Sequence, residues 1–309
     1  MIEPPKLRLG TRQSPLAMAQ AREARTRLCA AHGWPESAIE LVPVRASGDK
    51  VQDRPLAEIG GKALWTKELD QWLGEGHIDG AVHSMKDVET LRPDGLAIAA
   101  ILPRADVRDV LIGAVSVSEI PRGARVGTSA PRRAAQMLYH RPDCEIVTFR
   151  GNVATRLARL AAGEAEVTLL AAAGLGRLGE NGVGTPLDPD DWIPAPAQGA
   201  IGIECRADDA RAHALIAAID DGFSRASVMA ERALLASLGG TCHSPVAALS
   251  IREGDAIRLR AILFSPDGNE RVEGDCRVVP GDGAAPAALA ADLLARATAG
   301  ISAHFVGPA

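Results

Sequence analysis

The stretch LGTRQSPLAMAQ, residues 9–20, starts with an apolar residue, a glycine and a threonine and ends inside a helix pattern. A second stretch, VGTSAPRRAAQM at residues 126–137, repeats the apolar-Gly-Thr start, a nearby proline and an Ala-Gln pair. Each stands where a short strand pattern gives way to a helix pattern. Two copies of this strand-to-helix turn predict two similar α/β lobes with a ligand-binding cleft between them.

Strand and helix patterns alternate on both sides of these turns over the first two thirds of the chain. After the first turn, the Ala-rich run at 15–31 predicts a helix with Ser14 as its N-cap and Pro15 at its first position. Such alternation predicts mainly parallel sheets with crossover helices. In these sheets the functional loops gather at the carboxyl ends of the strands.

The last third of the chain has a different pattern. A proline-rich crossing segment at 192–206 leads to a helix, the loop LGGTCHSPV at 238–246 and a hairpin around SPDG at 265–268. This order predicts a smaller α+β domain with an antiparallel sheet. The predicted domains are domain 1 at 1–102 and 197–220, domain 2 at 103–196, and domain 3 at 221–309.

Composition excludes several classes of protein. The 309 residues carry a net charge of −5, which argues against a nucleic-acid-binding surface. No window approaches 18 apolar residues, and the first ten residues lack the apolar run of a signal peptide. The five cysteines are scattered without a C-x-x-C, so neither a zinc ribbon nor a thioredoxin-type site is indicated, and we expect no metal. Their odd number without clustering fits a reducing compartment. We expect a cytoplasmic protein without a membrane partner.

Cationic and hydroxyl side chains gather at the predicted turns. Several stand at predicted helix N-termini, where free N–H groups and the helix dipole favour anions, and arginine can pair with a carboxylate through two bonds. A single arginine is usually a solvated surface residue, but five or more on facing loops indicate a ligand with several negative groups. The set is Arg12, Ser14, Thr128, Ser129, Arg132, Arg133, Arg150, Arg156 and Arg177.

The motif HSMKDV, residues 83–88, follows a predicted strand and places Lys86 and Asp87 at its carboxyl end. Asp87 is the best candidate for a central carboxylate, because an acid among cations stays ionised and can stabilise a cation or move protons. A plain Lys–Asp pair on a loop is the alternative.

The polar loop at 48–65 resembles a mobile lid from which Lys62 could reach an anion; the alternative is a plain connector.

Cys242 is an isolated thiol on a Gly/Thr/Ser/Pro turn. The neighbouring His243 does not imply a Cys-His dyad, since adjacent side chains rarely point at one another. An inert buried thiol is the commonest fate of such a cysteine. On a glycine-rich turn that faces a cationic cleft, a reactive thiolate is the other reading.

Eight motifs closely resemble the porphobilinogen deaminase (hydroxymethylbilane synthase) family, in the family's order and over nearly the whole chain. They are GTRQSPLA, GGKALWTKELD, AVHSMKDV, VGTSAPRRAAQ, FRGNVATRL, AAAGLGRLG, PAQGAIGIECR and ERALLASLGGTCHSPVAA. The resemblance implies three domains, the first two like the halves of a type II periplasmic binding protein, in a monomer. It also implies a dipyrromethane cofactor joined by a thioether to Cys242. On this primer a transferase of haem biosynthesis would condense four porphobilinogen molecules, with loss of ammonia, into the linear tetrapyrrole hydroxymethylbilane.

The resemblance also implies roles for single residues. Asp87 matches the catalytic aspartate, which would assist ammonia loss and stabilise a cationic intermediate. The residues that would bind the cofactor are Cys242, Lys86, Thr128, Ser129, Arg132, Arg133, Arg150, Gly151 and Gln198. Those that would bind the substrate carboxylates are Arg12, Ser14, Lys62, Arg150, Arg156 and Arg177.

Three positions depart from the family pattern, and two other functions compete with the main one. Ala130 removes a hydroxyl donor, Trp65 places a larger ring near the lid, and Thr241 tolerates a positive φ less well than glycine. A non-catalytic anion-binding protein would leave Cys242 and the third domain without a role. A cysteine-nucleophile amidase would lack a well-placed histidine and a nucleophile elbow.

Overall fold

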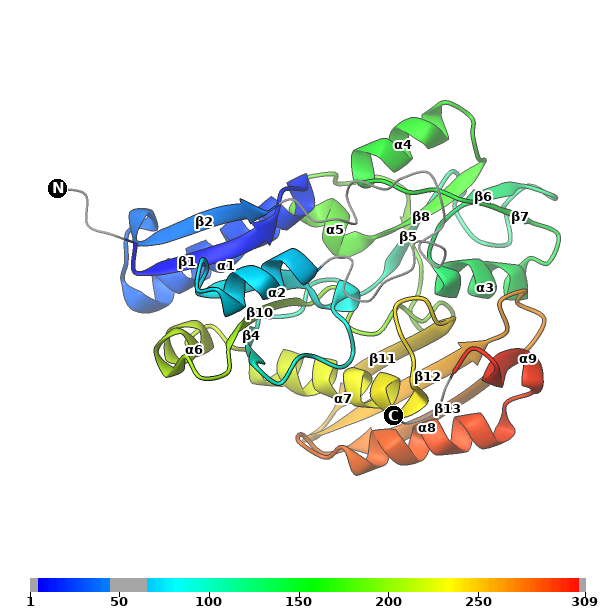
Figure 1. Cartoon of the computed structure of the whole chain (residues 1–309). Coiled ribbons are helices and arrows are strands. Elements are labelled where there is room, and N and C mark those ends of the chain that lie inside the picture. Colours follow the sequence, from blue (N-terminus) through cyan, green and yellow to red (C-terminus); the bar gives the residue numbers. More distant parts are fainter. Residues whose placement is uncertain (1–4, 45–65, 306–309) are drawn as a thin grey trace. The chain divides into compact units, whose positions relative to one another are not determined.

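The computed structural model describes residues 5–44 and 66–305 (Figure 1). By its internal contacts the chain divides into two compact units. The described part of unit 1 comprises residues 5–44, 66–105 and 199–225, and that of unit 2 comprises residues 106–198 and 226–305.

Unit 1 holds a five-stranded sheet in the order β2-β1-β3-β10-β4. The strands β2, β1 and β3 pair in parallel, whereas β10 is antiparallel to both β3 and β4. Four strands therefore run one way and β10 runs the other. The elements of unit 1 are β1 (Leu7–Arg12), α1 (Pro15–His32), η1 (Glu36–Ala38), β2 (Ile39–Val44), α2 (Lys67–Gly74), β3 (Gly80–Ser84), η4 (Met85–Asp87), β4 (Leu96–Ile101), β10 (Ile201–Arg206) and α6 (Ala210–Ala217).

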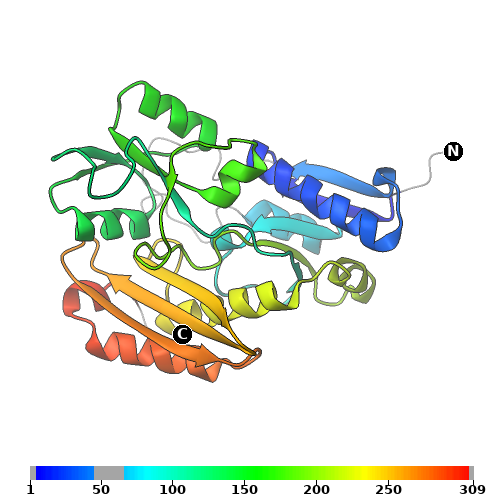
Figure 2. The same ribbon diagram turned by 180° about the vertical axis from the view of Figure 1, so that it is seen from behind.

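The helix α1 begins as its sequence predicts. The Ser14 hydroxyl accepts the N–H of Ala17 at 3.3 Å, and Pro15 occupies the first position. The helix lies along β1 and β3, and its buried face includes Ala21, Ala24 and Leu28. One core cluster of unit 1 combines these residues with buried side chains from β1, β2, β3, β4, β10 and α6. Figure 2 shows α1 running beside β1 and β2 from the opposite side.

Unit 2 contains a second five-stranded sheet, in the order β7-β6-β8-β5-β9. Here β7, β6 and β8 pair in parallel, and β5 is antiparallel to both β8 and β9. Position by position this repeats the arrangement of unit 1, including one reversed strand at the fourth place. The elements are β5 (Asp109–Ile112), β6 (Arg125–Gly127), α3 (Pro131–His140), β7 (Glu145–Val147), α4 (Val153–Ala161), β8 (Val167–Ala171), α5 (Ala172–Arg177) and β9 (Thr185–Pro186).

The repeated Gly-Thr pair has the same physical basis in both sheets. A Cβ atom on Gly10 would collide with Ile78, and one on Gly127 would lie 2.5 Å from the ring of Phe149. Neither glycine has a positive φ, so each is needed for space rather than for backbone freedom. Both following threonines are buried: the Thr11 hydroxyl donates to the Ala17 carbonyl, and the Thr128 hydroxyl accepts the N–H of Ala130.

The C-terminal part of unit 2 is built on an antiparallel sheet of β11 (Val246–Glu253), β12 (Ala256–Phe264) and β13 (Arg271–Val278). The helix α7 (Gly222–Leu238) precedes this sheet. The helix α8 (Ala284–Arg296) follows it and packs on β13, and α9 (Ala299–Ser302) is the last helix of the described residues (Figures 1 and 2). A buried apolar cluster joins α3 to β11 and β12 through Ala135, Leu249 and Phe264.

The predicted fold class is confirmed: two α/β lobes of the type II periplasmic-binding-protein kind, and a smaller α+β part with an antiparallel sheet. The sheets are mainly parallel, but each has one reversed strand. Each reversed strand is the first one after the chain passes between units, near residues 105–106 and 198–199. The predicted domain boundaries stay a prediction. Within the described residues, no helix is long and apolar enough to cross a membrane.

Candidate active site

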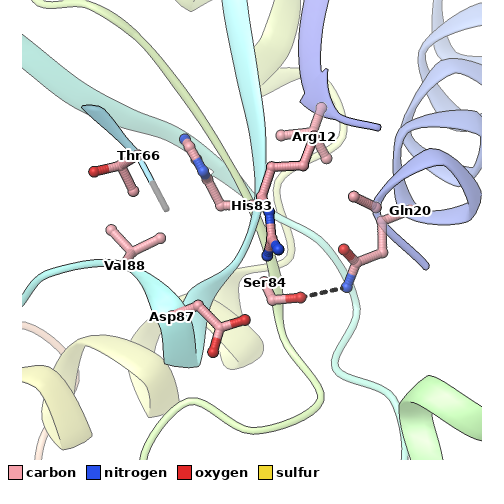
Figure 3. Close-up of a pocket in the computed structure, with 9 residues that line it drawn as sticks. Arg12, Gln20, Thr66, His83, Ser84, Asp87 and Val88 are labelled. Carbon is pink, nitrogen blue, oxygen red and sulfur yellow. Dashed lines mark hydrogen bonds between the residues drawn. The ribbon is translucent and has the colours of Figure 1, made fainter. Parts of the chain in front are cut away.

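A small pocket in unit 1 forms at the carboxyl end of β3. Because η4 follows β3 directly, Asp87 stands at this strand end, as its motif predicts. The side chains of Arg12 and Asp87 reach from β1 and η4 towards Ser84 (Figure 3). Asp87 is partly exposed and has no ion pair or hydrogen bond among the described residues, so its carboxylate is open to a ligand. The lining residues are Arg12, Ala17, Gln20, Thr66, Val82, His83, Ser84, Asp87 and Val88.

A hydrogen bond holds one wall of the pocket. Gln20 on α1 is 4% exposed, and its Nε2 donates to the Ser84 hydroxyl at 2.7 Å. The bond ties α1 to the end of β3 (Figure 3). Gln20 belongs to the repeated Ala-Gln pair, but its role could not be read from the sequence, because Ser84 lies 64 residues away.

A buried charge cluster of His83, Glu204 and Arg92 lies next to the pocket, where His83 is one of the lining residues. The His83 Nε2 is 3.2 Å from Oε2 of the fully buried Glu204, a close contact that does not meet hydrogen-bond geometry. Both Glu204 oxygens accept N–H groups of Arg92 at 2.8 Å. Burial alone would raise the pKa of Glu204, but His83 and Arg92 lower it to about 2. His83 is itself a residue of β3.

In unit 2 the predicted residues after β6 fall into two groups. Thr128 and Ala130 form the turn before α3; Ala130 is the N-cap, and no side chain caps the helix there. The missing hydroxyl at Ala130 therefore leaves the N-terminal N–H groups of α3 without a side-chain cap. Ser129 between them is partly exposed. Arg132 and Arg133, on the first turn of α3, are only 4% and 5% exposed.

Both of these arginines bind Asp109, the first residue of β5. The Nη2 atoms of Arg132 and Arg133 each donate to Asp109 at 2.7 Å. Gln198, also predicted to bind the cofactor, donates to the same carboxylate at 2.9 Å. Burial acts to raise the pKa of Asp109, but the two guanidinium charges outweigh it and hold the pKa far below the usual range. Asp109 was not among the predicted residues.

The remaining predicted cations of unit 2 lie around α4 and α5. Arg150 is 7% exposed and precedes Gly151, whose φ of 106° is in the region that favours glycine. Arg156 on α4 donates through Nε to the Gly151 carbonyl at 3.1 Å. Arg177 is the last residue of α5 and is partly exposed. Lys86, in unit 1, is the partly exposed neighbour of Asp87.

The loop that carries Cys242 is a defined turn. Gly239 takes a φ of 63°, and Ala197 is the one non-glycine residue in the described chain with a positive φ. Thr241 therefore avoids the strain that its sequence position suggests. Its N–H donates to the Ser244 hydroxyl, and its own hydroxyl accepts the N–H of His243, both at 3.1 Å.

Cys242 differs from the other cysteines in exposure. All five lie within the described residues and form no disulfide, and Cys242 is exposed whereas Cys29, Cys144 and Cys205 are buried. Burial raises the pKa of these three thiols, that of Cys205 to about 11, which suppresses their thiolate forms. Cys276 is of intermediate exposure, so the most exposed of the five thiols is the one on the turn. The predicted lid at 48–65, with Lys62 and Trp65, lies outside the described residues.

Comparison with known proteins identifies relatives over nearly the whole chain. Residues 7–214 match the model of "Porphobilinogen deaminase, dipyromethane cofactor binding domain", and residues 226–295 match "Porphobilinogen deaminase, C-terminal domain". The porphobilinogen deaminase of Sphingopyxis alaskensis is 56% identical over 305 residues, 97% of this chain and 96% of the relative. That of Paracoccus denitrificans is 51% identical over 298 residues, 95% of each chain. Among solved structures, a periplasmic binding protein of Salmonella typhimurium with high arginine specificity is 13% identical, with a TM-score of 0.38, over 73% of this chain and 96% of that chain.

The chain belongs to the porphobilinogen deaminase family. Membership confirms the predicted activity class, a transferase of tetrapyrrole biosynthesis that makes hydroxymethylbilane. It also supports a dipyrromethane cofactor, because the matching model is that of the cofactor-binding domain.

Proposed function

We propose that Cys242 carries the dipyrromethane through a thioether and that Asp87 is the catalytic carboxylate for the stepwise addition of four porphobilinogen molecules. We infer this attachment from the exposure of the Cys242 thiol on its turn, because the thiols of Cys29, Cys144 and Cys205 are buried. When bound, the dipyrromethane supplies the pyrrole carbon to which the first substrate unit is joined.

The turn suits Cys242 to its role as an anchor. The bonds between Thr241, His243 and Ser244 order the backbone around the thiol while leaving the side chain exposed. An ordered turn limits the rotational freedom of whatever is attached there. Burial lowers the pKa of the neighbouring His243, and its Nδ1 is buried without a hydrogen-bond partner among the described residues.

Asp87 has the exposure and position that the catalytic role requires. Its carboxylate has no competing ion pair in the described chain and lies in a pocket with the Arg12 side chain. A carboxylate held this way can accept hydrogen bonds from pyrrole N–H groups and stabilise positive charge on a bound ring. Arg12 and Ser14 bind the acetate and propionate groups of the substrate, and Lys86 binds those of the cofactor.

The cations of unit 2 bind the carboxylates of the cofactor and growing chain. Charge-assisted bonds to a carboxylate contribute about 1.5–3 kcal/mol each, so several arginines can hold a polyanion. Thr128, Ser129, Arg132, Arg133, Arg150, Gly151 and Gln198 are assigned to the cofactor. Arg150, Arg156 and Arg177 are assigned to the substrate units, with Lys62 from the lid.

The proposal extends to the domain boundaries, the cellular location and the oligomeric state. We assign three domains with the predicted boundaries, supported by the three separate sheets and by a second family model that begins at residue 226. A cytoplasmic location is supported by five cysteines without a disulfide. One chain supplies all the assigned residues, as a monomer requires, and the net charge of −5 argues against a nucleic-acid partner.

The mass of the intact protein tests the attachment. Purified protein should weigh more than its sequence by two linked pyrrole units, and peptide mapping should place the added mass on Cys242. Cys242→Ala should show the plain sequence mass and no turnover of porphobilinogen. Cys276→Ala, at a half-buried cysteine, is the matched control and should keep both mass and turnover. Active wild-type protein of unmodified mass would refute the proposal.

A further inference from the structure

We propose that Asp109 is a positioning residue, which holds the Arg132 and Arg133 guanidinium groups in the geometry that binds the cofactor carboxylates. The inference rests on the cofactor role proposed above for these arginines. It assigns a function to a buried aspartate that lies outside every motif predicted to bind cofactor or substrate.

The Asp109 carboxylate is fully buried and accepts four hydrogen bonds. Oδ2 accepts from Arg132 Nη2 at 2.7 Å and from Trp192 Nε1 at 2.9 Å. Oδ1 accepts from Arg133 Nη2 at 2.7 Å and from Gln198 Nε2 at 2.9 Å. Four donors fill the acceptor sites of a carboxylate, so the group is fixed in orientation and has no capacity left for a ligand.

Each guanidinium is also fixed at a second nitrogen. Arg132 Nη1 donates to the Ile193 carbonyl at 3.1 Å, and Arg133 Nη1 donates to the Leu169 carbonyl at 2.9 Å. The Nε–H of each arginine is buried and has no hydrogen-bond partner among the described residues. Buried donors are normally paired in folded proteins, so these two N–H groups require an explanation.

The charges of the cluster do not cancel. Two guanidinium groups and one carboxylate leave a single positive charge on the first turn of α3, where the helix dipole is also positive. Asp109 thus serves two ends: it relieves the repulsion between two buried cations and leaves a net charge that attracts an anion. A carboxylate ligand would complete the charge balance.

The cluster is connected to the part of unit 2 that carries Cys242. Trp192, Ile193 and Gln198, which all bond to the cluster, belong to one segment of the chain. The Ala248 N–H on β11 donates to the Pro194 carbonyl of this segment at 3.1 Å. The buried Glu231 on α7 accepts the N–H groups of both Ala197, at 2.6 Å, and Ser250, at 2.7 Å.

These bonds connect the arginine cluster to the elements on either side of the Cys242 loop. The elements α7 and β11 flank the Cys242 loop in sequence, and the segment at 192–198 joins them to Asp109. Ala197 adopts a φ of 59°, a strained value for alanine, and its N–H bond to Glu231 holds it there. Strain retained at this point indicates that the path of the segment matters to the site.

Cofactor loading of Asp109→Asn tests the proposal. Asparagine has nearly the size of aspartate but lacks the charge, and its NH₂ group opposes one arginine. The fraction of folded protein that carries the two-pyrrole mass on Cys242 should fall at least tenfold. Asp106→Asn is the matched control: it makes the same charge change three residues away, at an exposed carboxylate that pairs in the described chain only with Arg108, and it should load within twofold of wild type. Thermal midpoints of all variants report the separate effect on folding.

Asp109→Glu covers the case in which the asparagine variant does not fold. It keeps the charge but moves the carboxylate by one methylene, and it should lower loading while raising the KM for porphobilinogen in the loaded fraction. Wild-type loading and KM in either folded variant would overturn the proposal. So would failure of both variants to fold while Asp106→Asn folds, since Asp109 would then serve folding. Wild-type protein without the added mass would instead refute the proposed function.

Discussion

Single carboxylates in this protein differ in what surrounds them, and that difference separates their roles. Asp87 is partly exposed, has no ion pair in the described chain and lines a pocket. Asp109 and Glu204 are fully buried and held by arginines. A carboxylate saturated by protein donors stabilises structure, whereas one left open can act on a ligand.

Asp87→Asn should therefore abolish most turnover and leave the fold intact. Loss of a carboxylate that assists proton transfer and stabilises charge lowers the rate by about 100-fold or more. Steady-state turnover of porphobilinogen measures the loss, and the intact mass should still show the cofactor. Asp94→Asn makes the same charge change at an exposed site in unit 1 and should leave turnover unaltered. Near-normal turnover of Asp87→Asn would remove this residue from the catalytic role.

At the scale of elements, the repeated Gly-Thr turn is a packing device. Gly10 and Gly127 stand at matching places in the two sheets, each against a large side chain that leaves no room for a Cβ. The ring of Phe149 is fully buried and follows β7, just before Arg150. Crowding at Gly127 thus connects the turn after β6 to the segment that presents Arg150.

Gly127→Ala should destabilise the protein by about 1–3 kcal/mol, because its Cβ would overlap a buried ring that cannot move away. The thermal midpoint measures the loss. Gly95→Ala is the matched control: no atom lies within 4 Å of its Cβ position and its φ is not positive, so its effect should stay within about 0.5 kcal/mol. Equal midpoints for the two variants would contradict the packing argument.

At the scale of the whole molecule, each unit contains a buried carboxylate held by arginine. The pKa of Glu204 in unit 1 is lowered to about 2, and that of Asp109 in unit 2 lies far below its usual range. A group whose pKa is depressed by folding stabilises the protein above its unfolded pKa. That stabilisation is lost as the pH falls towards the folded pKa.

The free energy of unfolding should hence decrease as the pH falls from about 4.5 to about 2. Glu204→Gln should make this decrease shallower and cost about 3 kcal/mol at pH 7, where the wild-type carboxylate is charged and paired. Denaturant titrations at a series of pH values measure both effects. Glu166→Gln is the control: the pKa of Glu166 is also lowered to about 2, but its pair with Arg125 is exposed and should contribute little. An unchanged pH dependence in Glu204→Gln would contradict the assignment.

Local pattern and motif were enough to predict much of this protein. Strand and helix periodicity, the Ser14 cap, the Gly-Thr turns, the placement of Asp87 after a strand and the isolated Cys242 turn all depend on residues near one another in sequence. The same patterns could not show the reversed strands β5 and β10, because strand direction is set by where the chain crosses between units.

What the sequence determined by itself is the class of fold, the family and the residues of its motifs. Only the tertiary structure decided what those residues touch. The sequence predicts Arg132 and Arg133 as ligand-binding cations at a turn, yet the structure buries them on Asp109, 23 and 24 residues away, together with Trp192 and Gln198, 83 and 89 residues away. A buried charge needs partners at about 3 Å, and folding alone brings such distant residues together.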